Sequence, residues 1–453
     1  MILSFSVSNF RSIHGEQTLN LVASKRLGAT HNDHLVAIPG VDESVLKTAV
    51  LYGANGAGKS NLFRALAYTK TIALRARKKN TGTKRESFRL GGAHAEPSGF
   101  DLQFVASEKV FRFGCEVDDD RILKEWLAEV KGEKLEIIYE RITQAEGEVV
   151  VELGTSLNAS AKLRALATVG GPQNASFLAT IRANLKAEDY GTELETVINW
   201  FDLSLQLVAP DSTPTALGRT LADNADFAMF AGAFLKHAST GIEHLNVDKK
   251  EITEDRLRAI LPEEMVSTIL KNLNEEGSSS ILLGEDSELL IERTEQDHYY
   301  LITIQAAHQG GDGRAISFKL SDESDGTKRL LHLMPALHAL QSEDVVFVID
   351  EIDRSMHPML VWKFLEFFLK GCNEGGRQVI VTTHESNLLD LELLRRDEIW
   401  FVEKDQAGAT TLYPLTDFKV RQDLEIRKHY LQGRFGAVPF LGNLDRLVEG
   451  GSK

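Results

Sequence analysis

The stretch Leu51-Tyr-Gly-Ala-Asn-Gly-Ala-Gly-Lys-Ser-Asn61 decides the fold of this chain of 453 residues. It contains the complete pattern G-x-x-x-x-G-K-[ST] from Gly53 to Ser60, which is typical of a phosphate-binding loop. Glycine lets the backbone adopt turns that a Cβ disfavours, so that successive N–H groups face one concavity. The surrounding residues agree, because an apolar run at 48–52 predicts a buried strand and residues 61–67 predict a helix. This context disfavours the alternative of a glycine-rich turn that occurs by chance.

Each part of the loop has an expected role in binding ATP and Mg²⁺. The start of the helix favours the phosphate charge, Lys59 is expected to reach the β- and γ-phosphates, and the Ser60 hydroxyl is expected to bind the metal. The whole loop is expected to line the nucleotide; its residues are Gly53, Asn55, Gly56, Ala57, Gly58, Lys59, Ser60 and Asn61.

Two further apolar runs end in polar side chains. Residues 345–349 are followed by Asp350 and Glu351, and residues 377–383 by His384. Parallel strands of this kind present such side chains at the carboxyl edge of a sheet, where ligands bind. We expect Asp350 to complete the Mg²⁺ shell, Glu351 to orient or deprotonate the attacking water, and His384 to reach the γ-phosphate or that water. The alternatives are an acidic loop and a structural histidine; the upstream phosphate-binding loop favours ATP hydrolysis.

The segment 320–331 precedes the acidic strand by one apolar helix. Ser321 or Ser324 is a candidate N-cap of that helix. A functional alternative exists, because a serine hydroxyl and exposed N–H groups at a helix start also suit a γ-phosphate. In that case Ser324, Gly326 and Thr327 bind nucleotide. Since a whole helix separates them from the acidic strand, we expect them to meet the phosphate-binding loop of a second copy of the chain.

Two basic features near the N-terminus have open interpretations. Arg11 follows a predicted strand at 2–7 and lies either in a solvated turn or near the bound nucleotide. The run 74–85 contains six basic residues and no acidic one. A solvated loop is the favoured account of this run, with a site for nucleic acid or an acidic protein as the alternative.

The remaining periodicity indicates the domain organisation. Alternation over 100–117 predicts an antiparallel hairpin, followed by strands near Ile137 and Val149, and a second hairpin is predicted at 280–305. Between them the pattern turns helical, with apolar stripes that are expected to be core; these are Leu194, Val197, Ile198 and Phe201, and then Phe227, Phe230 and Phe234. Breaks at 170–172 and 210–214 disfavour a long coiled coil.

We therefore predict an α/β P-loop NTPase with a mixed or parallel sheet, an antiparallel β-subdomain and a helical insertion. The expected division is 1–154 for the first half of an ATPase head, 155–275 for the helical insertion and 276–453 for the second half. An apolar share of 43% supports a full core.

Composition narrows the partners. The net charge of −15 argues against wholesale coating of nucleic acid. Cys115 and Cys372 lack C-x-x-C spacing, so neither a disulfide framework nor a zinc hook is indicated. The N-terminus lacks the features of a signal peptide, and no run approaches the roughly 18 apolar residues of a membrane span. We expect a cytoplasmic protein with no membrane partner.

The order of these motifs resembles the ATP-binding-cassette superfamily in its repair-protein branch, with its ATPase head. More narrowly it resembles the bacterial abortive-infection and overcoming-lysogenization-defect-like ATPases, including ATPase subunits of the phage-anti-restriction-induced, Septu-like and retron-linked systems. The segments that carry the resemblance are 2–12, 53–60, 324–327, 350–358, 382–385, 396–404 and 430–439.

The resemblance implies a homodimer that encloses each ATP between two copies. Lys59, Ser60, Asp350, Glu351 and His384 would act from one copy, and Ser324 and Gly326 from the other. The segment 354–358 would cross the dimer interface. The sequence departs from the transporter form of the signature, Leu-Ser-Gly-Gly-Gln, so this role follows from position more than from residue type. Only about 50 residues follow Trp400, so any nuclease is expected to be a separate protein.

Three functions follow as hypotheses. The first is an ATP-hydrolysing switch that controls an effector encoded nearby, a nuclease or toxin, when a phage protein or nucleic acid triggers it. The second is a DNA-repair ATPase similar to RecF-type and SMC-type proteins. The third is a scaffold in which ATP is only a structural ligand.

Overall fold

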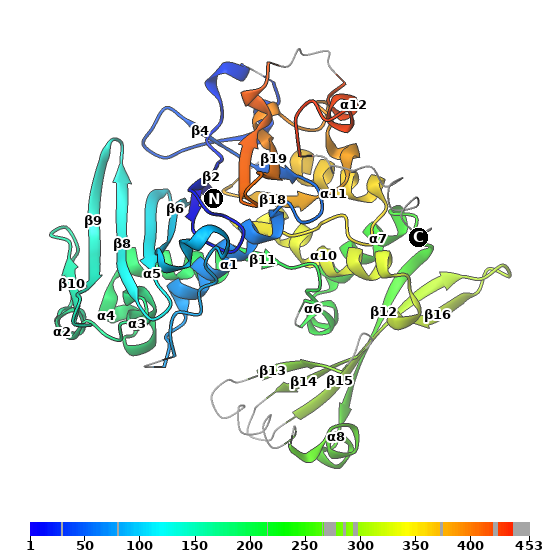
Figure 1. Ribbon diagram of the computed structural model, residues 1–453. Helices are drawn as coiled ribbons and strands as arrows, with labels where there is room; N and C mark the ends of the chain where they lie inside the picture. Colours follow the sequence, from blue (N-terminus) through cyan, green and yellow to red (C-terminus); the bar gives the residue numbers. More distant parts are fainter. Residues whose placement is uncertain are drawn as a thin grey trace, which may run out of the picture. The chain divides into compact units, whose positions relative to one another are not determined.

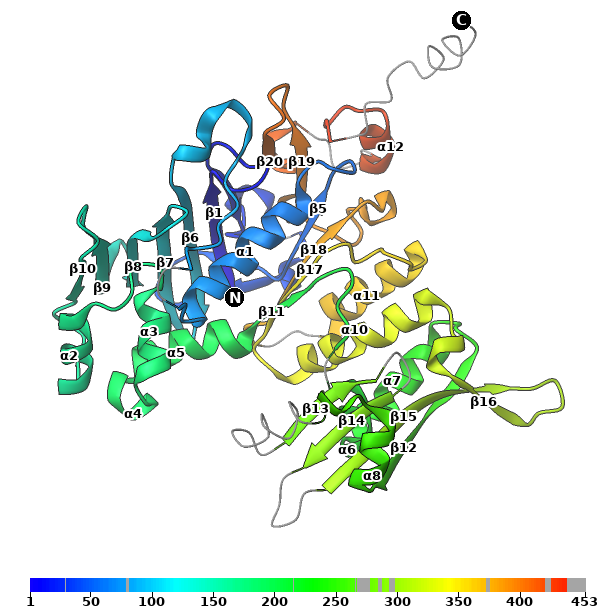
Figure 2. The same ribbon diagram turned by 60° about the horizontal axis from the view of Figure 1, so that its bottom comes forward.

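The computed structural model describes residues 1–28, 30–78, 81–214, 216–264, 266, 278–283, 287–292, 298–371, 375–419 and 425–437 (Figures 1 and 2). Contacts divide the chain into two compact units. The first comprises Met1–Pro210, Glu343–Asp353 and Leu365–Lys453, and the second comprises Asp211–Ser342 and Arg354–Phe364. Cys372 and the last two residues of the segment 430–439 lie outside the described residues.

A six-stranded sheet of the first unit carries the sequence motifs. Its order is β11 (Leu205–Val208), β17 (Val346–Ile349), β18 (Gln378–Thr383), β5 (Thr48–Tyr52), β19 (Ile399–Lys404) and β20 (Thr410–Pro414). The first five strands are parallel and β20 is antiparallel. Every residue of β5, β17 and β18 is buried, as expected for central parallel strands. The predicted strands are therefore confirmed, and the strand that precedes Asp350 and Glu351 lies beside the strand that precedes His384.

An antiparallel sheet forms the other layer of the first unit. Its order is β10 (Val149–Leu153), β9 (Lys134–Thr143), β8 (Ile122–Lys131), β7 (Lys109–Val117), β6 (Ser98–Ala106), β1 (Ile2–Ser8) and β2 (Gln17–Asn20). This order confirms the hairpin predicted at 100–117 and the strands near Ile137 and Val149. A short hairpin joins β3 (Leu35–Ala37) to β4 (Ser44–Leu46).

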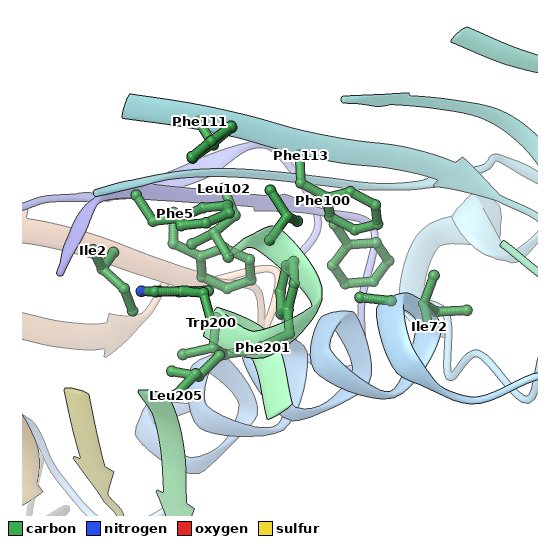
Figure 3. Close-up of a cluster of buried hydrophobic side chains, with 14 of the residues drawn as sticks. Ile2, Phe5, Ile72, Phe100, Leu102, Phe111, Phe113, Trp200, Phe201 and Leu205 are labelled. Atoms are coloured by element: carbon green, nitrogen blue, oxygen red, sulfur yellow. The ribbon is translucent and has the colours of Figure 1, made fainter. Parts of the chain in front are cut away.

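Helix α1 (Lys59–Leu74) packs between these two sheets, and one apolar core joins all three elements (Figure 2). Figure 3 shows the rings of Trp200 and Phe201 between the antiparallel strands and the helix that carries Ile72. Trp200 stacks on Phe104 with ring centroids 3.9 Å apart, and Phe201 meets Phe113 edge to face at 5.3 Å. Such aromatic pairs fix the spacing between layers beyond simple burial.

The region 155–275 differs from the expected helical insertion. Its first helices are α2 (Ala161–Val169), α3 (Phe177–Asn184), α4 (Ala187–Tyr190) and α5 (Thr192–Asn199), and a π-turn follows over Trp200–Ser204. The stripe from Leu194 to Phe201 is buried as predicted, but in the core of the first unit. The division therefore falls at Pro210 rather than near residue 155, because these short helices cover the antiparallel sheet.

The second unit is built on another antiparallel sheet. Its order is β12 (Ile242–Ile252), β15 (His298–Gln309), β14 (Ser287–Glu292) and β13 (Ser278–Leu282), and β16 (Ala315–Lys319) also pairs with β15. The hairpin predicted at 280–305 is confirmed. The helical pattern missed β12, an edge strand whose mostly polar residues give no clear alternation.

Among the described residues, the helices that lie wholly in the second unit are α6 (Leu217–Asp223), α7 (Ala225–His237), α8 (Glu254–Ile260) and α10 (Asp325–Ser342). Helix α11 (Pro358–Gly371) begins in this unit, and α12 (Ile426–Leu431) belongs to the first. Phe227 is buried, whereas Phe230 and Phe234 are only half-buried, so the predicted core stripe is partly confirmed. In the part of the chain that is described, no helix is long and apolar enough to cross a membrane.

Candidate nucleotide site

The predicted phosphate-binding loop connects β5 to α1. Gly56 and Gly58 have φ values of 78° and 116°, in the region that favours glycine. A Cβ at Gly58 would lie 2.1 Å from Oγ1 of Thr410, and one at Gly53 would lie 2.3 Å from the carbonyl oxygen of Val402. The close approach of the loop to β19 and β20 therefore requires glycine at both positions. Helix α1 begins at Lys59, and among the described residues no side chain caps its start.

The side chain of Lys59 is buried beside the loop. Its ammonium donates hydrogen bonds to the carbonyl oxygens of Gly53 at 2.7 Å and Ala54 at 3.3 Å, and it lies 3.2 Å from Nδ1 of His384. Burial lowers the pKa of Lys59 to about 8, although the carboxylates of the neighbouring acidic run oppose this shift; they are Asp353, Asp350 and Glu351. The structure thus brings together the lysine, the histidine and the acidic residues predicted from three separate stretches of sequence.

Thr382 organises the acidic end of β17. Its hydroxyl donates to Oδ1 of Asp350 at 2.5 Å and accepts the backbone N–H of Glu351 at 2.8 Å. Asp350 is buried. Glu351 has a φ of 48°, a conformation that is uncommon for residues other than glycine and that recurs at functional sites. A threonine on the neighbouring strand therefore holds both carboxylate residues in place.

Asp353 is a further residue of this site that the motif analysis missed. Its Oδ2 accepts the backbone N–H of His384 at 3.2 Å. Its Oδ1 is buried and has no hydrogen-bond partner within the described ranges. A buried carboxylate oxygen without a donor is costly unless a ligand satisfies it. The signals were present in the third carboxylate of Asp350-Glu-Ile-Asp353 and in the paired threonines before His384.

These residues fit a magnesium nucleotide. The glycine positions keep the loop open to phosphate, and α1 offers an uncapped start for its negative charge. The Ser60 hydroxyl and the Asp350 carboxylate are oxygen ligands of the type that Mg²⁺ prefers. The unpaired oxygen of Asp353 adds an acceptor beside them.

Comparison with known proteins now adds the family. A family model described as an AAA domain, putative AbiEii toxin, type IV toxin–antitoxin system, matches residues 49–151 and 222–390. The chain belongs to this family. The predicted relation to abortive-infection ATPases is thereby confirmed at family level, and the two matched ranges of this AAA domain include both the phosphate-binding loop and the acidic strand.

Solved structures of SMC head domains also match. An SMC head bound to the C-terminal winged-helix domain of ScpA is 12% identical, with coverage of 91% of this chain and 97% of that chain and a TM-score of 0.41. The SMC head domain from Thermotoga maritima is 14% identical, with coverage of 91% of this chain and 98% of that chain and a TM-score of 0.38. The head domain from Pyrococcus furiosus, with an extended coiled coil and bound to the C-terminal domain of ScpA, is 13% identical. The match covers 91% of this chain and 96% of that chain, with a TM-score of 0.35. No curated protein matches this AAA-domain chain.

Arg11 lies in a turn that contacts the phosphate-binding loop through its neighbour. Oγ of Ser12 accepts a hydrogen bond from Nδ2 of Asn61 at 2.6 Å, at the start of α1. The guanidinium of Arg11 itself pairs with Glu86 at 3.1 Å. Burial lowers the pKa of Arg11, and Arg64 and Arg89 lower it further against the pull of Glu86. The position of the turn agrees with a place near the nucleotide, and contact of Arg11 with the nucleotide stays a prediction.

The basic run at 74–85 is divided by the structure. Arg85 is buried and donates to Oδ1 of Asp119 at 2.7 Å and to the carbonyl oxygens of His94 and Glu96 at 2.7 and 2.5 Å. Its role is therefore structural. The exposed basic side chains of the run are Arg75, Lys78 and Lys84, and residues 79 and 80 lie outside the described ranges.

The predicted second half of the nucleotide site belongs to the second unit. Oγ of Ser324 accepts the backbone N–H of Thr327 at 3.1 Å, which confirms that Ser324 caps the start of α10. Ser324 is exposed. A Cβ at Gly326 would lie 2.5 Å from the carbonyl oxygen of Ser355, so the start of α10 packs tightly on the segment 354–358. The nucleotide role of Ser324, Gly326 and Thr327 stays a prediction.

Proposed function

We propose that this chain is an ATP-hydrolysing switch of a bacterial anti-phage defence system. One observation carries the proposal. Lys59, His384 and the three carboxylates of residues 350–353 meet at the carboxyl edge of one parallel sheet, directly beside a phosphate-binding loop. That edge is where α/β proteins bind ligands, and this combination of charges suits phosphoryl transfer to water.

Each residue has a proposed role. Lys59 exchanges its bonds to the loop carbonyls for the β- and γ-phosphates. Ser60 and Asp350 would hold Mg²⁺, which would supply positive charge to neutralise the phosphates. Glu351 accepts the proton of the attacking water, and His384 donates to the γ-phosphate. Thr382 keeps Asp350 and Glu351 oriented through its two hydrogen bonds.

A second copy of the chain completes the site in this proposal. Its Ser324, Gly326 and Thr327 present a hydroxyl and a helix start, groups that bind anions without bringing a charge of their own. ATP then contacts both copies only when they are closed. A hundredfold preference of ATP for that closed state shifts the equilibrium by about 2.7 kcal/mol. Hydrolysis removes this preference, so the rate of hydrolysis sets how long the closed state lasts.

The closed dimer would restrain or activate a separate effector, a nuclease or toxin encoded nearby, and a phage protein or nucleic acid would trigger it in the cytoplasm. The family description supports this, because it links the AAA domain to an abortive-infection toxin and to toxin–antitoxin systems. The convergence of Lys59, His384 and the carboxylates of residues 350–353 supports an ATP-driven switch as well.

A plaque assay with the native locus tests the proposal. Protection against phage is expected to disappear with Lys59→Ala and to persist with Lys134→Ala, an exposed lysine of β9 far from these motifs in sequence. Both variants are expected to accumulate to wild-type levels. Unchanged protection in Lys59→Ala would contradict the switch.

The second candidate is a DNA-binding ATPase similar to RecF-type and SMC-type proteins, for which the exposed basic side chains are the supporting observation. Simultaneous neutralisation of Arg75, Lys78 and Lys84 tests it, with Arg85 left intact because its bonds are structural. A DNA affinity that falls steeply with salt and collapses in this triple variant would favour DNA binding over effector control.

A further inference from the structure

A cluster of metal-ligand side chains lies far along the chain from the nucleotide motifs, in the segment before β3. His31, Asp33 and His34 each offer one donor atom, and these three atoms lie within 4.8 Å of one another. His34 is buried, His31 is half-buried and Asp33 is exposed. The spacing His-x-Asp-His carries no established motif, so only the fold reveals that the three side chains converge.

The ring of His34 is oriented by a buried carboxylate. Its Nδ1 lies 3.0 and 3.1 Å from the two carboxylate oxygens of Glu398, which is fully buried. An ionised carboxylate only accepts hydrogen bonds, so Nδ1 carries the proton. In the neutral ring Nε2 then has the lone pair, and it lies 4.0 Å from Oδ2 of Asp33.

The ring of His31 is fixed in the same manner. Its Nε2 lies 2.8 Å from the backbone carbonyl oxygen of Leu391, which also only accepts. The lone pair of the neutral ring is therefore on Nδ1. The rings of His31 and His34 stack with centroids 4.8 Å apart and planes inclined by 24°. A carbonyl or carboxylate behind each imidazole is the arrangement that supports metal-binding histidines.

The backbone around the cluster is held from both sides. Arg395 is buried, bonds to the carbonyl oxygen of Thr30 and pairs with Asp397 at 3.0 Å. Oδ2 of Asp397 in turn accepts the backbone N–H of Ser24 at 2.8 Å. Lys47 donates to the carbonyl oxygen of Asp33 at 2.6 Å. The two imidazoles are thus positioned in advance, which lowers the entropic cost of binding an ion, and the exposed Asp33 side chain adjusts to it.

We propose that His31, Asp33 and His34 bind one Zn²⁺ ion. Two imidazoles and one carboxylate are a typical set for zinc, whereas Mg²⁺ prefers oxygen ligands. Tetrahedral zinc places its ligand atoms about 3.3 Å apart, so the 4.0 Å between Asp33 and His34 has to shorten by less than about 1 Å, and the widest separation in the cluster by up to about 1.5 Å. Water or a partner's side chain fills the fourth position. The rings that hold the ion are joined to residues 391–398, which lead into β19, by the hydrogen bonds of His31 to Leu391 and of His34 to Glu398.

Zinc binding to the full chain, stripped with a chelator and titrated with Zn²⁺ against a competing indicator, tests the proposal. One zinc ion per chain is expected. His31→Ala and Asp33→Asn are each expected to weaken binding at least tenfold, and Glu398→Gln to weaken it about 10–100-fold. His237→Ala, an exposed histidine of α7, is the matched control and is expected to bind as wild type does.

Two measurements separate loss of the site from loss of the fold. Without zinc, each variant is expected to melt at the same temperature as the zinc-free wild-type protein. Added zinc is expected to raise the melting temperature of the wild type and of His237→Ala only. X-ray absorption at the zinc edge of the wild-type protein is expected to show two imidazoles and oxygen ligands. Equal zinc binding by wild type and the His31→Ala/Asp33→Asn double variant, or an absorption spectrum without imidazole, would overturn the proposal.

Discussion

The carboxyl edge of the parallel sheet and the start of α10 are opposites in chemistry. At the sheet edge, a buried lysine meets a histidine and three carboxylates. At the start of α10, an exposed serine caps the helix, and Gly326 lies against a backbone carbonyl. The first region gathers a lysine, a histidine and carboxylates around the phosphate-binding loop, whereas the second offers a serine hydroxyl and helix-start N–H groups beside the ion pair of Asp325 with Lys328 at 3.2 Å. They belong to different compact units, so substitutions can damage one and spare the other.

The largest effect is expected from Glu351→Gln. The amide keeps the shape of the side chain and its backbone bond to Thr382, but it no longer accepts a proton. ATP hydrolysis should fall by about 10²–10⁴-fold, while ATP binding persists. Phosphate release and equilibrium binding measure the two quantities.

The same variant tests whether the sheet edge and the start of α10 act together. If a second copy covers the nucleotide, ATP should convert Glu351→Gln into a stable dimer by light scattering. If the molecular mass of Glu351→Gln in solution did not change with ATP, the start of α10 would have no role at the nucleotide and the proposed dimer would be wrong. Turnover at the wild-type rate would remove Glu351 as the base.

A pair of glycine substitutions sharpens the contrast. Gly58→Ala should abolish ATP binding and destabilise the fold by about 1–3 kcal/mol, because its φ of 116° and its contact with Thr410 exclude a Cβ. Gly326→Ala should retain ATP binding by each chain but lose ATP-dependent dimerisation, since a Cβ there would displace the segment at Ser355. Binding, thermal melting and light scattering report these outcomes.

Gly311→Ala is the matched control, because nothing lies within 4 Å of a Cβ at that position. It should behave as wild type in all three measurements. Equal loss of ATP binding in Gly58→Ala and Gly326→Ala would show that the two regions are not separable.

The sequence predicted the sheet edge far better than it predicted the unit boundaries. Asp350 and His384 directly follow buried parallel strands, and Lys59 follows the loop after a third such strand, β5; parallel strands bring their carboxyl ends together whatever the distance along the chain. The short helices of 161–199 gave correct periodicity but no sign of which sheet they cover. A periodic pattern shows which face of a helix is buried, but not which sheet that face packs against. The helices were therefore assigned to an insertion that begins near residue 155, whereas the structure places the boundary at Pro210.

Residues that act through hydrogen bonds were the other gap. Thr382 and Asp353 belong to no loop pattern, and their roles depend on the pairing of β17 with β18. The ligands His31 and His34 depend likewise on Leu391 and Glu398, more than 350 positions away. Pairing over such distances is a property of the fold and leaves no local signature.

A smaller effect is expected from pH at the sheet edge. Burial lowers the pKa of Lys59 to about 8 in the free protein, and bound phosphates should raise it. ATP affinity should therefore be constant below pH 8, where the ammonium is charged, and should fall above it by up to about tenfold per pH unit. Lys59→Arg, which stays charged, should bind more weakly but without this dependence. A wild-type affinity that is flat from pH 7 to 9.5 would contradict the assignment.

The smallest effect is expected from substitutions of Ser324, which test whether this residue does more than cap α10. Ser324→Ala should destabilise the protein by about 1 kcal/mol, because the N–H of Thr327 loses its acceptor, whereas Ser324→Asn keeps a good cap and should melt as wild type does. Both variants lack the hydroxyl proposed to meet the γ-phosphate. If hydrolysis and ATP-dependent dimerisation fall in both variants, the hydroxyl has a role that stability does not explain. If they fall only in Ser324→Ala, the serine acts as a helix cap, and the start of α10 contacts the nucleotide only through its backbone N–H groups.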